Sequence, residues 1–212
     1  MIITKYFSEL DYKGIYRKAH AIIFRTQNCW EEIGHKQESI KSIIYNYAFP
    51  LVLLIAVCRF LGALLNTDYY NASFLYALFS AGMSLVTTIA IIFLSILLFN
   101  FVISYFDIPR NLQCSATIIL YGFTPFYFAM AFSSLLPEFS LFVILGMYAL
   151  SLIWIGTREL LGMEFQYRYT FIFTLFFLFT GLYIFFYTVE GIVTSYIFIN
   201  SKAMELLNEL PQ

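Results

Sequence analysis

Long apolar runs, separated by short polar connections, dominate this sequence. Five of them are long enough to cross a hydrocarbon core, which takes about 20 helical residues. These runs are residues 43–65, 72–106, 113–136, 139–161 and 169–199. Lipid offers no hydrogen-bond partner to a backbone amide, so each run is predicted to be a helix that satisfies its own backbone. The pattern therefore predicts an all-α, polytopic membrane protein built as a bundle of five transmembrane helices.

Composition supports this class. The 212 residues are 61% hydrophobic and only 12% charged. A soluble domain is roughly 45–50% apolar and about 25% charged. A soluble chain of this length has no interior large enough to bury so much apolar surface, which indicates an integral membrane protein.

The first 42 residues have a different pattern. Ile15, Ala19 and Ile22 recur at helical spacing among basic residues, which is typical of an amphipathic helix in the headgroup plane. We expect an interfacial anchor, with a docking platform for a cytosolic partner as the alternative. The predicted division is thus an N-terminal interfacial segment (1–42), a five-helix membrane domain (43–199) and a short tail (200–212).

Basic residues predict the orientation. Seven of the twelve lie in residues 1–42, and three more, Arg110, Arg158 and Arg168, fall in or beside the second and fourth connections. Positive charge favours the cytoplasmic side. We expect a cytoplasmic N-terminus and an extracytoplasmic tail. No cleavable signal peptide is expected, so the first apolar run would direct insertion.

Polar residues form stripes on two of the predicted helices. Glu190 belongs to one that recurs at steps of three and four, together with Thr180, Tyr183, Tyr187 and Thr194. A second contains Ser80, Ser84, Thr88 and Ser95. Such stripes face the bundle and allow close helix packing with hydrogen bonds between helices; a polar pathway for a substrate is the alternative. Pro125 should bend the third helix, where Thr124 and Tyr121 can satisfy a freed carbonyl.

Arg59 and Glu190 are the two ionisable residues that lie well inside predicted spans. A lone charge at mid-membrane costs at least roughly 2.5–3.5 kcal/mol on insertion scales. We therefore expect the two to form a structural ion pair. The alternatives are separate snorkelling toward the headgroups and a transport role for Glu190.

No motif for an enzyme, a cofactor or a metal is visible. There is no GxGxxG, phosphate-binding loop, HExxH or nucleophile elbow. Cys29, Cys58 and Cys114 are scattered and are expected to behave as small apolar residues. The net charge of −1 argues against binding to nucleic acid.

Three segments resemble bacterial Yip1-domain proteins, over about residues 25–199. "CWEEIGHKQESIKSIIYNYAFPLVLLIAVCRFLGALL" resembles the opening of that family, with a tryptophan and acidic residues before a proline-containing first span. "ILYGFTPFYFAMAFSSLLP" is similar to its third span. "YALSLIWIGTRELLGME" looks like the fourth span and its exit.

The resemblance implies five membrane helices, a cytoplasmic N-terminus and no known catalytic centre. Eukaryotic relatives act in vesicle trafficking and contact Rab GTPases. "YFDIPRNLQ" only faintly echoes their Asp-Leu-Pro-Tyr motif, so no Rab-binding role is carried over. We expect a non-enzymatic protein of a bacterial cytoplasmic (inner) membrane that binds other membrane proteins or a second copy, or that organises lipid. The alternative is a small permease or proton-coupled transporter that uses Glu190.

Overall fold

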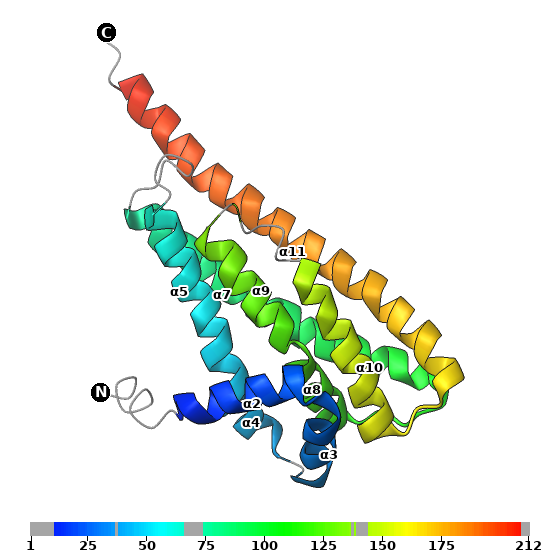
Figure 1. The fold of residues 1–212 in the computed structure, drawn as a ribbon. Coiled ribbons are helices and arrows are strands. Elements are labelled where there is room, and N and C mark those ends of the chain that lie inside the picture. The colour runs from blue at the N-terminus through cyan, green and yellow to red at the C-terminus, as the bar shows by residue number, and fades with distance from the viewer. Residues whose placement is uncertain (1–10, 37, 66–73, 137, 139–143, 209–212) are drawn as a thin grey trace.

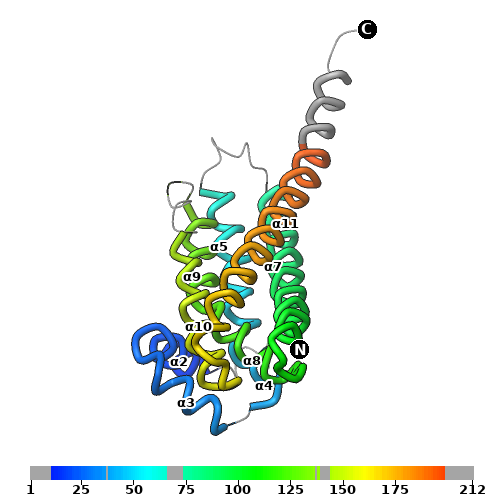
Figure 2. Tube along the Cα trace, turned by 90° about the vertical axis from the view of Figure 1, so that its right-hand side faces the viewer, coloured from blue at the N-terminus to red at the C-terminus, as the bar shows by residue number. Residues whose placement is uncertain are grey.

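The computed structural model describes residues 11–36, 38–65, 74–136, 138 and 144–208, with side chains as far as residue 198. Every regular element among them is a helix. The long helices run side by side as a bundle (Figure 1): α5 (Phe49–Leu65), α7 (Phe74–Val102), α9 (Thr124–Leu135), α10 (Tyr148–Leu161) and α11 (Phe165–Asn208). Two shorter helices, α2 (Tyr12–Phe24) and α3 (Thr26–Lys36), lie across one end of this bundle (Figures 1 and 2).

Four helical stretches are long and apolar enough to cross a membrane: Ile40–Leu65, Phe74–Phe106, Ile144–Leu161 and Phe165–Phe198. The pair α8 (Leu112–Gly122) and α9, bent by 43°, makes a fifth if it counts as one span. The predicted all-α polytopic membrane fold is therefore confirmed. The last helix starts at Phe165, four residues before the predicted start. It also continues to Asn208, beyond the predicted end at residue 199, because the residues there are good helix formers. Residues 72–73 and 139–143 of the predicted spans lie outside the described residues.

The first span is continuous but irregular. α4 (Ile40–Ile43) is followed by a π-helical turn, η1 (Ile44–Ala48), and then by α5. Pro50 lies in the first turn of α5 and has no N–H to donate to the carbonyl of Asn46. The wider π-helical turn precedes this missing bond and absorbs the local change in hydrogen bonding.

Two connections reverse the chain tightly at the end of the bundle that carries α3. Gly162 has a φ of 60° and its N–H donates to the Arg158 carbonyl over 3.1 Å, which ends α10 in the left-handed conformation that glycine favours. The Asn111 side chain accepts the Cys114 N–H over 3.1 Å and caps the start of α8. The following helices are thereby set antiparallel to those before them.

The N-terminal helices share the hydrophobic core of the bundle. Ile22 in α2 and Trp30 in α3 are both completely buried. The Trp30 ring lies on Gly156 in α10, where a Cβ atom would come within 2.9 Å of the ring. On the outer side, Tyr16 remains 70% exposed. The amphipathic pattern of this segment therefore reflects both a face packed on the bundle and an outer face.

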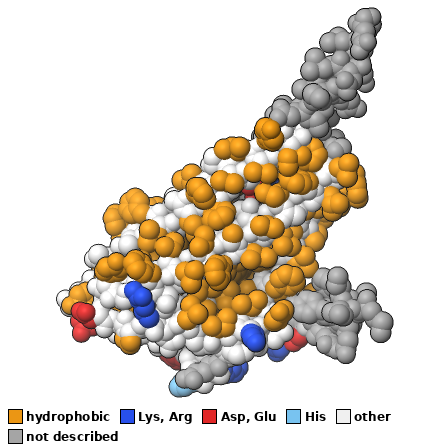
Figure 3. Space-filling view, turned by 180° about the vertical axis from the view of Figure 1, so that it is seen from behind, with side chains coloured by type: hydrophobic (Ala, Val, Ile, Leu, Met, Phe, Trp, Pro, Cys, Tyr) orange, Lys and Arg blue, Asp and Glu red, His pale blue; other side chains and the backbone are white. Residues whose placement is uncertain are grey.

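The surface also divides between apolar and charged regions. Hydrophobic side chains cover most of the bundle in the view of Figure 3, whereas the charged side chains seen there gather mainly toward its lower end. This distribution agrees with a bundle that lies in hydrocarbon and has one charged end in the headgroup region.

Gly62 is the point of closest approach between α5 and α9, which yields a first prediction. A Cβ atom at Gly62 would lie 2.7 Å from the Leu135 carbonyl oxygen, which is backbone and cannot move aside alone. Gly62→Ala should therefore lower the free energy of unfolding by about 1–3 kcal/mol, measured by denaturation in mixed micelles.

Gly82→Ala is the matched control, because a Cβ atom at this exposed position in α7 would meet nothing within 4 Å. It should be neutral or slightly stabilising, since alanine is the better helix former. Equal effects of the two substitutions would contradict the close contact at Gly62.

Candidate functional site

Arg59 and Glu190 come together inside the bundle. Arg59 Nη2 lies 3.9 Å from Glu190 Oε1, and the two side chains are 19% and 9% exposed. Arg59 Nε also donates to the Ser80 hydroxyl over 2.9 Å. The structure therefore places both predicted intramembrane ions in one polar site, to which α5, α7 and α11 all contribute.

Hydroxyl groups surround this ion pair. A cavity of about 20 Å³ lies against Arg59 and Glu190. Its other polar lining residues are Ser84, Thr87, Thr88, Ser134, Tyr183 and Tyr187. Roughly 10–15 Å³ is enough to hold one water molecule. The site therefore has room for about one water between the charges and the hydroxyl groups.

The predicted stripe on α11 faces the bundle only in part. Glu190 and Thr194 are buried, and Tyr183 is half-buried. Tyr187 is 50% exposed although it borders the small cavity, and Thr180 is exposed. The physical reason is that α11 is the outermost helix and touches its neighbours along a narrow strip. By contrast, the predicted stripe on α7 is buried throughout, at Ser80, Ser84, Thr88 and Ser95.

The bend in the third span lies at Phe123, two residues before Pro125. Pro125 occupies the first turn of α9, where its missing N–H has no helical partner to lose. The Thr124 hydroxyl donates to the Tyr121 carbonyl over 2.6 Å, as the sequence suggested. Tyr47 from η1 in turn hydrogen-bonds the Thr124 hydroxyl over 2.6 Å. The bend is thus held by side chains from both spans.

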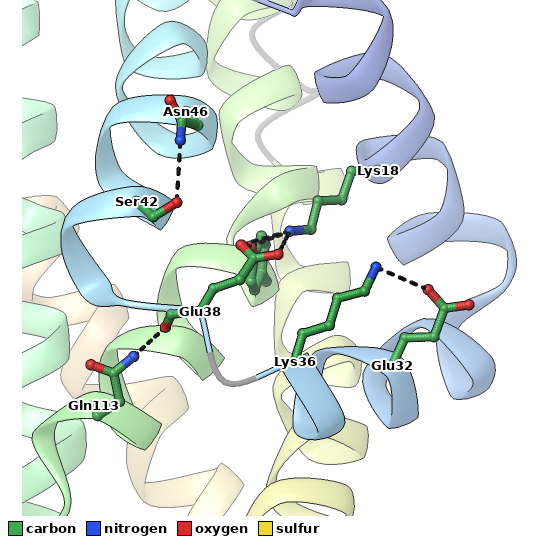
Figure 4. Close-up of polar contacts among 8 residues, drawn as sticks. Lys18, Glu32, Lys36, Glu38, Ser42, Asn46 and Gln113 are labelled. Carbon is green, nitrogen blue, oxygen red and sulfur yellow. Dashed lines mark hydrogen bonds and ion pairs between the residues drawn. The ribbon is translucent and has the colours of Figure 1, made fainter.

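A second polar cluster ties α2 to the bundle (Figure 4). Lys18 Nζ lies 2.9 and 3.0 Å from the two carboxylate oxygens of Glu38. The Tyr121 hydroxyl donates to Glu38 Oε2 over 2.8 Å, and Lys18 also contacts that hydroxyl. Gln113 donates to the Glu38 carbonyl. The cluster borders an open cavity of about 530 Å³ at the end of the bundle, lined in part by Trp30 and Tyr121.

The charge on Glu38 is stabilised by these contacts. Burial raises the pKa of the carboxyl, but the hydrogen bonds from Lys18 and Tyr121 and the Lys18 charge outweigh burial. The pKa of Glu38 therefore lies below its usual value. Sequence spacing gave no sign of this cluster, because Glu38 is 20 residues from Lys18 and 83 from Tyr121.

A third feature is an apolar cavity of about 350 Å³ between α7, α9, α10 and α11. Phe126, Leu150 and Phe176 are typical of its lining, and three further lining residues, Ile144, Met147 and Ile184, are exposed on the outer surface. Its few polar groups include Thr180 and Ser95. The Ser95 hydroxyl is buried without a hydrogen-bond partner. The cavity therefore suits an apolar ligand from the surrounding hydrocarbon.

The residues described by the structure contain no group of three or more His, Cys, Asp or Glu side chains that could hold a metal ion. Burial raises the pKa of the Cys29 thiol, which disfavours the nucleophilic thiolate. No family model, no curated protein and no solved structure matches the chain.

The ion pair yields a second prediction. Arg59→Leu and Glu190→Leu should each lower the free energy of unfolding by about 3–5 kcal/mol, because each leaves one buried charge without its partner. The double variant should recover part of the summed loss, since it removes both charges. Denaturation of all four proteins in the same micelles measures the coupling. Strictly additive losses would contradict a structural pair.

The Glu38 cluster yields a third prediction. A carboxyl whose pKa is lower in the folded state stabilises the protein above the unfolded pKa of about 4.3. This stabilisation is lost as pH falls through the lower folded pKa. Wild type should therefore be more stable than Glu38→Gln at pH 7, and the difference should shrink on acidification below about pH 4.3.

Glu32→Gln is the control, because Glu32 is an exposed carboxylate 4.0 Å from Lys36 on the same helix. It should change stability little at any pH. Thermal unfolding midpoints across the pH range provide the measurement. A pH-independent gap between wild type and Glu38→Gln would contradict the proposed role of the charge.

Proposed function

We propose that this chain is a non-enzymatic integral membrane protein of the Yip1-like type that binds other membrane components, in particular lipid. We place it in a bacterial cytoplasmic membrane with α2 and α3 on the cytoplasmic side, in line with its basic residues. The observation that carries the proposal is the contrast between two cavities among the spans. The polar one has room for about one water, whereas the apolar one measures about 350 Å³ and has exposed apolar residues in its lining.

The polar site argues for a structural role more than for transport. Arg59 and Glu190 lie close enough to neutralise each other, and Ser80 holds the arginine from α7. A cavity of about 20 Å³ does not admit a solute larger than water. Proton-coupled transport also uses a series of buried ionisable groups, and within the described spans Arg59 and Glu190 are paired only with each other. We therefore rank the permease below the binding protein.

The apolar cavity supports lipid as a ligand. Its position between membrane-spanning helices brings it into contact with acyl chains rather than with water. Aromatic and aliphatic side chains line it, which suits an apolar chain of a lipid.

Helix α11 is the surface best placed for a protein partner or a second copy. Only 6% of its most apolar window is buried within the bundle, against 33–50% for the other three unbroken spans. In hydrocarbon an exposed apolar face is already satisfied by lipid, so this exposure permits a second helix without requiring one. Partner binding at α11 is therefore the less specific half of the proposal.

A fourth prediction tests the lipid half. Thr180 is exposed and lines the apolar cavity, whereas Thr188 is exposed on the same helix away from it. Thr180→Trp should occupy part of the cavity and reduce co-purified lipid several-fold, while Thr188→Trp should retain it. Mass spectrometry of protein purified in mild detergent provides the measurement.

The same experiment separates the two candidate functions. Co-purified lipid that is lost in Thr180→Trp supports the binding protein. A stoichiometric polar solute that disappears in Glu190→Gln would favour the permease and overturn the proposal.

A further inference from the structure

Arg168 is a buried basic residue at the charged end of the bundle. It lies in the first turn of α11 and is 8% exposed. Its guanidinium lies 4.9 Å from the ring centre of Trp154 in α10 and 5.4 Å from that of Phe165. Two aromatic faces therefore cover the cation and hold it against the seam between α10 and α11.

No anion of the described chain neutralises this guanidinium. No carboxylate among the described residues lies within ion-pair distance of it. Arg168 Nε is fully buried without a hydrogen-bond acceptor. Aromatic contacts offset part of the cost of burying a charge, but they leave Nε without an acceptor, and no described side chain pairs with the terminal amino groups. An anion with several acceptor oxygens would therefore neutralise the guanidinium and accept its hydrogen bonds.

The surroundings place Arg168 at headgroup depth. Trp154, Phe165 and Tyr169 form an aromatic cluster with ring centres 4.8–5.8 Å apart. Phe165 and Tyr169 are each 59% exposed. Such amphipathic rings gather at the boundary between headgroups and hydrocarbon. The span that contains Arg168 begins three residues earlier, at Phe165.

The same seam leads from Arg168 to the apolar cavity. Phe176 and Tyr183 line that cavity and lie 8 and 15 residues further along α11. Eight helical residues rise roughly 12 Å. One leaflet of hydrocarbon is about 15 Å thick, half of the core. On α10, Leu150 lines the cavity one turn from Trp154. An acyl chain that starts near Arg168 therefore reaches the cavity within a single leaflet.

From this geometry we infer that the seam between α10 and α11 is a phospholipid site, in which Arg168 binds the phosphate and the apolar cavity takes an acyl chain. The inference rests on the proposed lipid-binding function and names the lipid class and the orientation. A phosphate supplies acceptor oxygens for the two terminal amino groups of the guanidinium, and Arg is suited to bind it through two parallel hydrogen bonds. The bound lipid belongs to the leaflet next to α2 and α3.

The test compares a lipid that has a phosphate-containing headgroup with one that has none. Delipidated full-length protein in detergent is titrated with phosphatidylglycerol, or with diacylglycerol carrying the same acyl chains, and occupancy is followed by native mass spectrometry. Wild type should bind phosphatidylglycerol at least roughly tenfold more tightly, as expected for a charge-assisted bidentate contact. Arg168→Gln should remove this preference and still bind diacylglycerol as wild type does, which also shows that the variant is folded.

Two further variants sharpen the result. Arg168→Lys keeps the charge but loses the paired hydrogen bonds, so it should retain part of the preference. Arg110→Gln removes a charge at the same end, where Arg110 contacts Ser104 and the Phe101 ring on the exposed surface. It should leave the preference unchanged.

The possible outcomes distinguish the phosphate site at Arg168 from lipid binding in general. An unchanged preference in Arg168→Gln would overturn the phosphate site while leaving lipid binding intact. Failure of wild type to bind either lipid would overturn the proposed function itself. Displacement of phosphatidylglycerol by inorganic phosphate at similar concentration would assign Arg168 to a free anion instead of a lipid.

Discussion

Charged and hydrogen-bonding groups that this chain places in hydrocarbon must find partners there, and this constraint organises the bundle. Arg59 and Glu190 are partners for each other, with Arg59 Nη2 3.9 Å from Glu190 Oε1, and the Ser80 hydroxyl is a further acceptor for Arg59. The pair matters for α11 in particular, because this helix is otherwise the least buried of the spans. A polar contact is more selective than apolar packing in lipid, where apolar surfaces gain little by meeting each other. The ion pair therefore supplies a specific position for α11 that its apolar residues do not.

The same constraint shapes the charged end. The bend at Phe123 frees the Tyr121 carbonyl, which the Thr124 hydroxyl satisfies. The Tyr121 hydroxyl donates a hydrogen bond to Glu38, and Glu38 forms an ion pair with Lys18 of α2. Together with the Trp30 ring on Gly156, these contacts close the end of the bundle with two amphipathic helices. The broken span and the two helices that cover this end of the bundle are thus parts of one arrangement.

The two buried cationic sites differ in whether the chain itself supplies an anion, and this difference bears on function. Inside the bundle the two ions pair with each other beside a cavity that has room for about one water, which favours a structural site. At Arg168 the cation lacks an anion, and the adjoining seam leads to a cavity of about 350 Å³. The phospholipid that we propose would supply both the missing anion and an apolar chain for the cavity.

The sequence by itself determined the membrane class, the spans and the bend near Pro125, because these depend on local apolar length and on a missing backbone donor. It also indicated that Arg59 and Glu190 need a partner, since the cost of a lone ion in lipid does not depend on the fold. The tertiary structure decided the rest. Arg168 looked like a residue of a connecting loop, and only the packing of α10 on α11 buries it beneath Trp154. Thr180 shares a stripe with Glu190 but lies exposed beside the apolar cavity, and Glu38 contacts Tyr121, 83 residues away in the sequence. Such outcomes depend on how each helix is rotated against its neighbours, which the spacing of residues along one helix does not specify.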